Sequence, residues 1–447
     1  MAEKPDQALI IASTLKDYDA LLNNTIIVNG SGIGVVPSLG EIYGDDYYIA
    51  PHIFENDLPH TFYRDSYTWS DNTYNDPVYA PKDWSFSYRC VFYANTILEG
   101  LAKLTATQEQ QQQYNQIKGS ALFFRAHSFY WLAQLFSPHY DKNTANTDLG
   151  IPLKQSADIT EKINRSSVQQ TYEKIIADLN EALPLLVSQP TLMTQPSKLA
   201  VYGLLARIYL TMGEYDKALS NSTLYLGIKN ELIDFSSLPP NSYYSMPDPK
   251  NNVEISFYSI LIDEILINLY PARIDSTIYA SYNNDDLRKA LFFEDAASDF
   301  GIPDDYGKYF SGSYDRTNKY FAGISTNEIY LIRAECYART GNISSALQDL
   351  NDLMRKRWKN SVPYPSITAS TQAEALDKVL TERRKELLFR GLRWVDIRRF
   401  NKEGANISIT RNIDGQIYTL PANSNKFTHL IPPEVIDFNP GLQQNPR

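Results

Sequence analysis

The chain has 447 residues, of which 43% are hydrophobic and 21% are charged, as in ordinary globular proteins that bury a sizeable core. Its formal net charge of -10 argues against nucleic acid as the main partner. The longest apolar run, residues 255–270, is interrupted by Asp263 and Glu264, so no membrane-spanning helix is expected.

The N-terminal part predicts one short helix followed by loops. The first residues have no apolar core, so they are not a signal peptide. An amphipathic helix is predicted over residues 13–23. Residues 29–83 are rich in Gly, Pro, Asp, Asn and Tyr and are expected to be an N-terminal loop region. An ordered loop region of this length is uncommon and is usually functional.

Helical repeats are predicted over residues 84–238 and again over 321–400. Two segments share one spacing of a small residue, a tyrosine, a glycine and a small residue, which suits a tetratricopeptide helix pair. The matching positions are Ala206, Tyr209, Gly213 and Ala218, and Ala334, Tyr337, Gly341 and Ala346. With the flanking helices, this predicts about four pairs. Cys90 and Cys336 lie inside apolar helical patterns, which favours two buried thiols over a disulfide.

Residues 239–320 are broken by prolines and are expected to be a loop-rich insertion into the helical array. Of the 32 tyrosines, ten lie in residues 1–110 and ten in 239–320, so aromatic residues are concentrated in the two loop regions. An aromatic face packs well on the C–H face of a sugar ring, while Asp, Asn and Arg hydrogen-bond its hydroxyls. The loop regions are therefore the expected ligand surface.

Ten residues are the candidate ligand contacts. Those of the first loop region are Tyr63, Arg64, Tyr67, Trp69, Asn72 and Tyr74, and those of the insertion are Tyr243, Tyr244, Tyr270 and Arg273. The alternative is that Tyr67 and Trp69 bury one face of a strand. Trp84, Trp358 and Trp394 lie in helical patterns and are expected in the core.

The segment from Glu374 to Phe400 predicts two helices that meet at Gly391, which can take the left-handed conformation that ends a helix. The second helix is expected to pack by Trp394. Seven basic residues in 381–400 lie among three acids, and Glu386 and Arg390 are spaced to pair at i,i+4. The run is therefore expected to be a solvated or internally paired face.

Three stretches resemble one family. ERRKELLFRGLRWVDIRRF near the C-terminus, LIPPEVIDFNPGLQQNPR at the end, and DYDALLNNT with PSLGEIYGDDYYI near the start are similar to segments of the SusD/RagB family. Arg390 departs from the pattern, because many members have an acid there. The resemblance covers the whole chain, 1–447, as a single SusD-like domain with a C-terminal tail over 401–447.

The resemblance implies a mainly α, tetratricopeptide-like superhelix whose large irregular loop insertions carry the ligand surface. It also implies a non-catalytic outer-membrane lipoprotein at the cell surface that captures a nutrient, most often a glycan, and delivers it to a SusC-type TonB-dependent transporter. No cofactor is implied. The family is anchored through a lipidated N-terminal cysteine, and we expect that cysteine and its leader to be absent from this chain.

Two other functions stay open: a tetratricopeptide scaffold that binds a peptide or protein, and a polysaccharide-cleaving enzyme. No HExxH, GxSxG, Walker or GxGxxG motif is present, and no two of the five histidines are spaced i,i+4 for a helical zinc site. The acidic groups at 283–286 and 304–305 favour turns or caps over a calcium loop. The sequence therefore predicts binding without catalysis or a metal.

Overall fold

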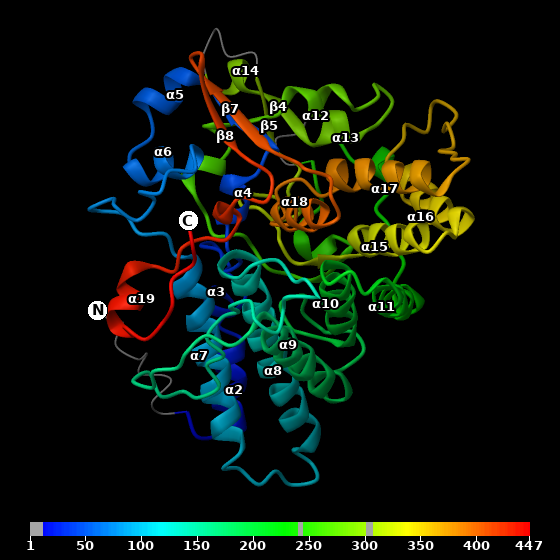
Figure 1. Cartoon of the computed structure of the whole chain (residues 1–447). Coiled ribbons are helices and arrows are strands. Elements are labelled where there is room, and N and C mark those ends of the chain that lie inside the picture. The colour runs from blue at the N-terminus through cyan, green and yellow to red at the C-terminus, as the bar shows by residue number, and fades with distance from the viewer. Residues whose placement is uncertain (1–11, 240–244, 301–306) are drawn as a thin grey trace.

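The computed structural model describes residues 12–239, 245–300 and 307–447. Helices predominate, and the short strands are paired two by two (Figure 1). The mainly α, tetratricopeptide-like fold predicted from the sequence is confirmed. No helix of the described ranges is long and apolar enough to cross a membrane.

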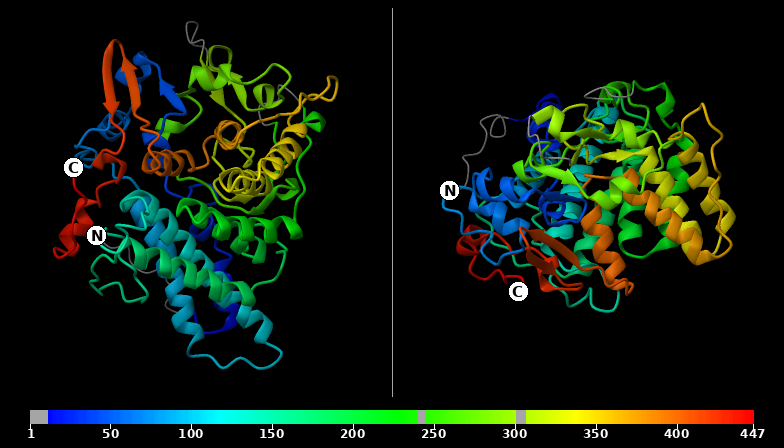
Figure 2. Two further views of the ribbon diagram at one scale, coloured as in Figure 1. Left: turned by 45° about the vertical axis from the view of Figure 1, so that its right-hand side comes forward. Right: turned by 90° about the horizontal axis from the view of Figure 1, so that it is seen from above.

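The long helices form a stacked array. From α7 to α17 each helix packs against its neighbour in the chain, and the contact of α11 with α15 joins the parts of the array on either side of the insertion, while α18 packs on α10 and on α4 (Leu39–Tyr43) (Figure 2). The members are α7 (Asp83–Leu101), α8 (Gln111–Phe136), α9 (Val168–Ala182), α10 (Lys198–Thr211), α11 (Tyr215–Ile228), α15 (Thr326–Arg339), α16 (Ile343–Arg355), α17 (Gln372–Glu386) and α18 (Arg393–Lys402).

The repeat positions behave as their spacing predicts. Gly213 (φ +74°) and Gly341 (φ +84°) adopt the left-handed conformation in the turns between α10 and α11 and between α15 and α16, a conformation that favours glycine. The four alanines of the pattern have no exposed surface: Ala206, Ala218, Ala334 and Ala346. Cys90 and Cys336 are buried free thiols, as expected.

The expected loop region 29–83 contains short regular elements. After α2 (Leu15–Leu22) and α3 (Thr25–Val28) come α4 (Leu39–Tyr43), β1 (Tyr47–Ile49), α5 (Pro51–Asn56) and α6 (Thr61–Tyr67). These helices were missed because five to seven residues are too few to show a helical period in sequence. The region is therefore a set of short elements with connecting loops.

The insertion and the C-terminal part supply the remaining elements. They are β2 (Ile255–Phe257), β3 (Ala272–Ile274), α12 (Ser276–Ala280), α13 (Arg288–Leu291), β4 (Phe293–Asp295), α14 (Ala296–Phe300), β5 (Lys308–Phe310), β6 (Ile324–Ser325), β7 (Ile409–Ile413), β8 (Gln416–Leu420) and α19 (Pro433–Phe438). The antiparallel pairs are β1 with β3, β2 with β6, β4 with β5, and β7 with β8. Short 3-10 helices cover Leu183–Leu185, Phe235–Ser237, Pro249–Asn251, Ile265–Ile267 and Asn425–Phe427.

A network of buried charges joins the insertion to α17. Arg288 of α13 donates to Glu382 (2.5 Å) and Glu386 (3.2 Å). Glu386 also accepts from Arg357, whose Nε and Nη2 lie 2.9 and 2.8 Å from the same oxygen, and Arg357 pairs with Glu254 at 2.7 Å. Four of these side chains have no exposed surface, and only that of Glu382 is 12% exposed. Breaking one buried partner leaves an uncompensated charge, so the network holds the insertion in place.

The joint between α17 and α18 agrees only in part with the prediction, because α17 ends at Glu386, with Leu387 as its C-cap, and not at Gly391. Gly391 has φ +76°, and the buried Trp394 stacks on Phe427 with ring centroids 4.6 Å apart. The predicted pair between Glu386 and Arg390 is wrong. Arg390 lies over the ring of Tyr314 at 4.2 Å, because the buried Glu386 is already taken by two arginines.

Candidate functional site

The two loop regions that the sequence singled out meet in space. Strand β1 pairs with β3 of the insertion, with Tyr48 opposite Arg273. Nearby, the carboxyl of Glu264 accepts hydrogen bonds from the hydroxyls of Tyr63 (3.2 Å) and Tyr79 (2.5 and 2.6 Å to its two oxygens). Residues some 200 positions apart therefore build one surface.

Glu264 is an unusual carboxyl. It is almost wholly buried, and desolvation, followed by the charge of Asp83, raises its pKa to about 8. The two tyrosine hydroxyls oppose that shift by hydrogen-bonding the carboxylate. At neutral pH Glu264 is therefore largely protonated, and it holds the tyrosines in place without adding a full charge.

Partly exposed aromatic side chains lie near Glu264. The ring of His60 stacks on Tyr79 with centroids 5.0 Å apart and an interplanar angle of 28°. Tyr270 is 40% exposed, and its hydroxyl donates to Asp57 at 3.0 Å, while Ile265 is 43% exposed. We call Asp57, His60, Tyr79, Ile265 and Tyr270 the junction surface. It combines flat apolar faces with polar atoms at the rim, which is the composition that a sugar ring requires.

Four of the ten predicted contacts lie in the core, which corrects the expectation that they face a ligand. They are Tyr63, Tyr67, Trp69 and Arg273, and none is more than 2% exposed. The indole N–H of Trp69 donates to the carbonyl of Tyr43 at 3.2 Å. The alternative that Tyr67 and Trp69 lie in one strand is also wrong, because Tyr67 ends α6 and Trp69 has φ +54°.

The cause of this burial is an arginine far along the chain. Arg411 of β7 lies over the rings of Tyr67 (3.7 Å) and Trp69 (4.7 Å). Its guanidinium also donates to the carbonyls of Tyr67, Ile42 and Gly44 at 2.5, 2.9 and 2.7 Å. The aromatic face that a ligand would use is thus occupied by a cation of the chain itself.

The other predicted contacts differ in their environment. Arg64 is half-buried and donates to the carbonyl of Leu58, and the half-buried Tyr74 donates to the carbonyl of Leu430 at 3.0 Å. Asn72 is exposed. Tyr270 is the predicted contact that belongs to the junction surface, while Tyr243 and Tyr244 lie outside the described residues.

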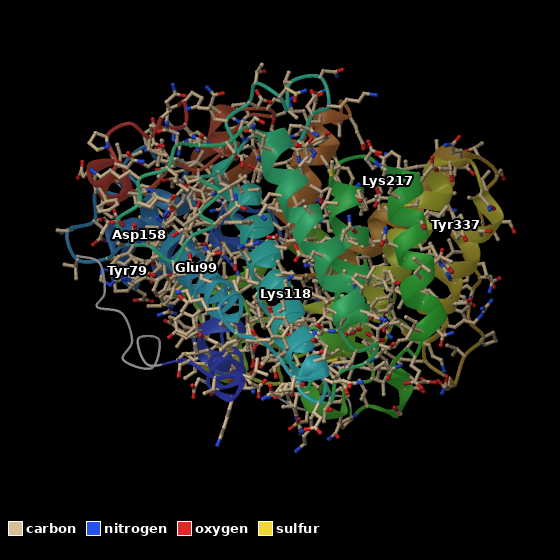
Figure 3. All side chains as sticks on the ribbon, turned by 90° about the horizontal axis from the view of Figure 1, so that it is seen from below. Tyr79, Glu99, Lys118, Asp158, Lys217 and Tyr337 are labelled. Atoms are coloured by element: carbon tan, nitrogen blue, oxygen red, sulfur yellow. The ribbon has the colours of Figure 1, made fainter. Side chains whose placement is uncertain are left out.

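Sequence reasoning missed His60, Tyr79 and Glu264. Tyr79 lies in the same loop region as the predicted contacts, and nothing in its sequence context sets it apart from them. Glu264 was noticed only because it interrupts an apolar run, and a carboxyl in such a position signals that specific hydrogen-bond donors must meet it. Figure 3 shows Tyr79 at the side of the molecule opposite Tyr337 of α15.

A groove of about 530 Å³ opens between α7, the connector 152–163 and α19. One face of α7 supplies Trp84, Tyr88 and Phe92, and α19 supplies Phe438, over whose ring Lys162 lies at 5.4 Å. The ring planes of Trp84 and Tyr88 meet at 39°, with centroids 4.8 Å apart. Trp84 is largely buried, as predicted, so the groove is mainly apolar with a charged rim.

Other buried acids also have structural partners. Asp83 accepts the backbone N–H groups of Ser38 (2.7 Å) and Leu39 (2.9 Å) at the start of α4, and burial raises its pKa to about 6. Glu41 accepts the N–H of Gly391 at 2.5 Å. Within the described ranges, no group of three or more His, Cys, Asp or Glu side chains is placed to hold a metal ion. Of the acidic groups considered for calcium, 304–305 lies outside these ranges.

The fold and the junction surface define a class of protein. The helical array is a frame, and the exposed aromatic residues come from the loops and insertion that the frame carries. Such an arrangement is typical of proteins that bind a ligand through loops on a rigid scaffold.

Comparison with known proteins identifies the family. A family model described as "Starch-binding associating with outer membrane" matches residues 1–210, and the model of the SusD family matches residues 307–447. The SusD-like protein P2 of Formosa agariphila is 23% identical over 419 residues, which cover 81% of this chain and 79% of that protein. The chain belongs to the SusD/RagB family.

Solved structures share the fold. A putative sugar binding protein from Bacteroides vulgatus aligns with a TM-score of 0.75 and 22% identity, covering 97% of this chain and 99% of that one. A SusD superfamily protein from Bacteroides thetaiotaomicron aligns with a TM-score of 0.75 and 23% identity, and the alignment covers 97% of this chain and 100% of that one. A SusD-like carbohydrate binding protein from Bacteroides vulgatus aligns with a TM-score of 0.70 and 21% identity, and the alignment covers 96% of this chain and 98% of that one.

Proposed function

We propose that this chain is a non-catalytic cell-surface protein that captures a glycan or oligosaccharide and delivers it to a SusC-type TonB-dependent transporter. The observation that carries the proposal is the match of both ends of the chain to SusD-type family models, one of them described as starch-binding and associating with the outer membrane. The protein would reach that membrane through a lipid anchor.

The junction surface is the proposed glycan contact. Tyr270 and the stacked pair of His60 and Tyr79 offer aromatic faces, and Asp57 offers a carboxylate at the rim. Tyr79 is fixed from below by its hydrogen bonds to Glu264, so less side-chain entropy is lost when a sugar stacks on it. Of the residues first predicted, Arg64, Asn72 and Tyr74 stay proposed as ligand contacts.

The hydrogen bonds of the buried acids support binding without turnover. Glycoside hydrolysis needs one carboxyl as acid and another as base or nucleophile across the scissile bond. Glu264 is hydrogen-bonded to two tyrosines, and Asp83 is hydrogen-bonded to the N-terminus of α4. Both carboxyls are therefore hydrogen-bonded to other groups of the chain.

The test is a glycan screen followed by calorimetry on variants. Tyr270→Ala and His60→Ala should each weaken binding of the retained glycan by roughly ten- to hundredfold, as expected for aromatic anchors. Tyr337→Ala is the matched control, because Tyr337 is a half-buried tyrosine of α15 on the opposite side of the molecule (Figure 3). Unchanged affinity in both variants would move the site elsewhere, and sustained release of new reducing ends would contradict the non-catalytic role.

A further inference from the structure

A second cavity lies on another part of the molecule, between the end of α8, helix α18 and the segment 423–428. Its volume is about 170 Å³, which is room for roughly ten water molecules or a small polyatomic ion. Pro138 and His139 follow α8, and Arg398, Asn401 and Lys402 come from one face of α18. No acid is among the described residues that line it.

Arg398 is the central charge of this cavity. It is 4% exposed, and its two terminal nitrogens donate to the carbonyls of Gln134 and Ser137 at the end of α8. Those carbonyls offer only the partial negative charge of a helix C-terminus, about half an elementary charge. Burial lowers the pKa of Arg398 to about 10, so it stays a cation at neutral pH.

The next residue, Arg399, has the anionic partners that Arg398 lacks among the described residues. Arg399 is equally buried and is paired with both Glu335 and Asp396. Arg398 forms no ion pair with any Asp or Glu in the part of the chain that the structure describes. A buried cation without an anionic partner is costly, and a bound anion would remove that cost.

Two further groups can meet an anion. Lys402 is exposed, and its Nζ lies 3.9 Å from the Asp141 carboxylate, at the outer limit of an ion pair. His139 is 7% exposed, and its Nδ1 has no hydrogen-bond partner within the described ranges. Burial and the nearby Arg398 hold the pKa of His139 well below its usual value, so the ring is neutral and has one N–H to donate.

We propose that this cavity binds a small oxyanion, a carboxylate or sulfate group, on Arg398, with Lys402 at the entrance and His139 as a hydrogen-bond donor. Such a group can be a free ion or a substituent on an acidic saccharide. Only the second source depends on the proposed glycan function.

Calorimetry with sodium sulfate and sodium glucuronate, at constant ionic strength in chloride, tests the site on the full chain. Both Lys402→Gln and Asn425→Trp change exposed residues and should preserve folding, which circular dichroism checks. Lys402→Gln should weaken binding roughly tenfold through loss of one charge-assisted bond, and Asn425→Trp should abolish it by filling the entrance. Lys217→Gln is the control, because Lys217 is also exposed and lies beside one carboxylate (Figure 3).

Binding that is weakened by Lys402→Gln, abolished by Asn425→Trp and kept in the control would establish the site. If glucuronate binds at least tenfold more tightly than sulfate, the site is assigned to an acidic saccharide. If glucuronate binds equally or more weakly, the site is assigned to a free ion. Equal binding by wild type and both variants, or no binding of either probe beyond chloride, would overturn the proposal. A neutral glycan held at the junction surface should be unaffected by Lys402→Gln, which separates this site from the proposed function.

Discussion

Replacing Glu386 with glutamine tests the buried network that joins the insertion to α17. The carboxylate accepts hydrogen bonds from Arg357, from Asn327 at 2.8 Å and from Arg288 at 3.2 Å. Glutamine keeps the size of the side chain and one acceptor oxygen but removes the charge. Two arginines then share fewer anionic partners in a site without solvent.

The size of the effect follows from the pKa of Glu386. Although burial alone would raise that pKa, the charges of Arg357 and Arg288 dominate and lower it from 4.5 to about 2. Each pKa unit corresponds to about 1.4 kcal/mol, so the carboxylate contributes about 3 kcal/mol to the free energy of unfolding at neutral pH. Since the folded-state pKa is lowered, this contribution is complete above pH 4.5 and is lost as the pH falls toward 2.

Urea unfolding followed by circular dichroism measures the effect at several pH values. Glu386→Gln should lower the free energy of unfolding by about 3 to 5 kcal/mol at pH 7, the usual cost of removing one partner of a buried pair. The gap to wild type should narrow below pH 4.5. Glu99→Gln is the control, since Glu99 is exposed and should change stability by less than about 0.5 kcal/mol. A loss below about 1 kcal/mol at pH 7, or a gap independent of pH, would refute the reasoning.

Three further predictions follow from other contacts. Glu264→Gln should raise stability more at pH 8 than at pH 5 in urea unfolding, because a carboxyl whose folded pKa is raised to about 8 destabilises the protein as the pH climbs from 4.5 to 8; equal effects at both values would contradict this. Gly34→Ala should lower the free energy of unfolding by more than about 2 kcal/mol, since φ is +81° and the new Cβ would lie 2.1 Å from the Leu261 carbonyl oxygen. Gly227→Ala in α11 meets open space and should raise the free energy of unfolding by up to about 1 kcal/mol. Similar unfolding curves for the two variants would count against the argument. Mild detergent extraction of the outer membrane should co-isolate one large barrel transporter with the full-length protein, and recovery of the protein alone would leave delivery unsupported.

The helical frame could be predicted because local spacing determines it. The glycines that turn between paired helices, Gly213 and Gly341, recur at a fixed distance from the alanines that pack inside them. The left-handed conformation of Gly391 could also be predicted, but the end of α17 could not, because the helix stops at Glu386, before this glycine. The short helices α4 to α6 carry no such repeated signal.

The candidate site could be predicted only in part, because distant residues decide which aromatic side chains stay exposed. Tyr67 and Trp69 are covered by Arg411, which lies more than 300 positions away in the sequence. Tyr63 meets Glu264 across 201 positions. Neither partner is visible from the composition of the loop, so the sequence could not show which of its aromatic residues are buried.

The position of Arg411 has a consequence for the order of folding. The region from α4 to α6 is made first during synthesis, yet the guanidinium that satisfies its carbonyls and covers its aromatic rings arrives in the last tenth of the chain. Until then, Tyr67 and Trp69 lack a partner that holds them in the core. Long-range contacts of this kind form late, because the entropy of closing a long loop is lost before the contact can stabilise the chain. A nascent chain that stops before β7 would therefore present these aromatic residues to the quality-control machinery of the cell.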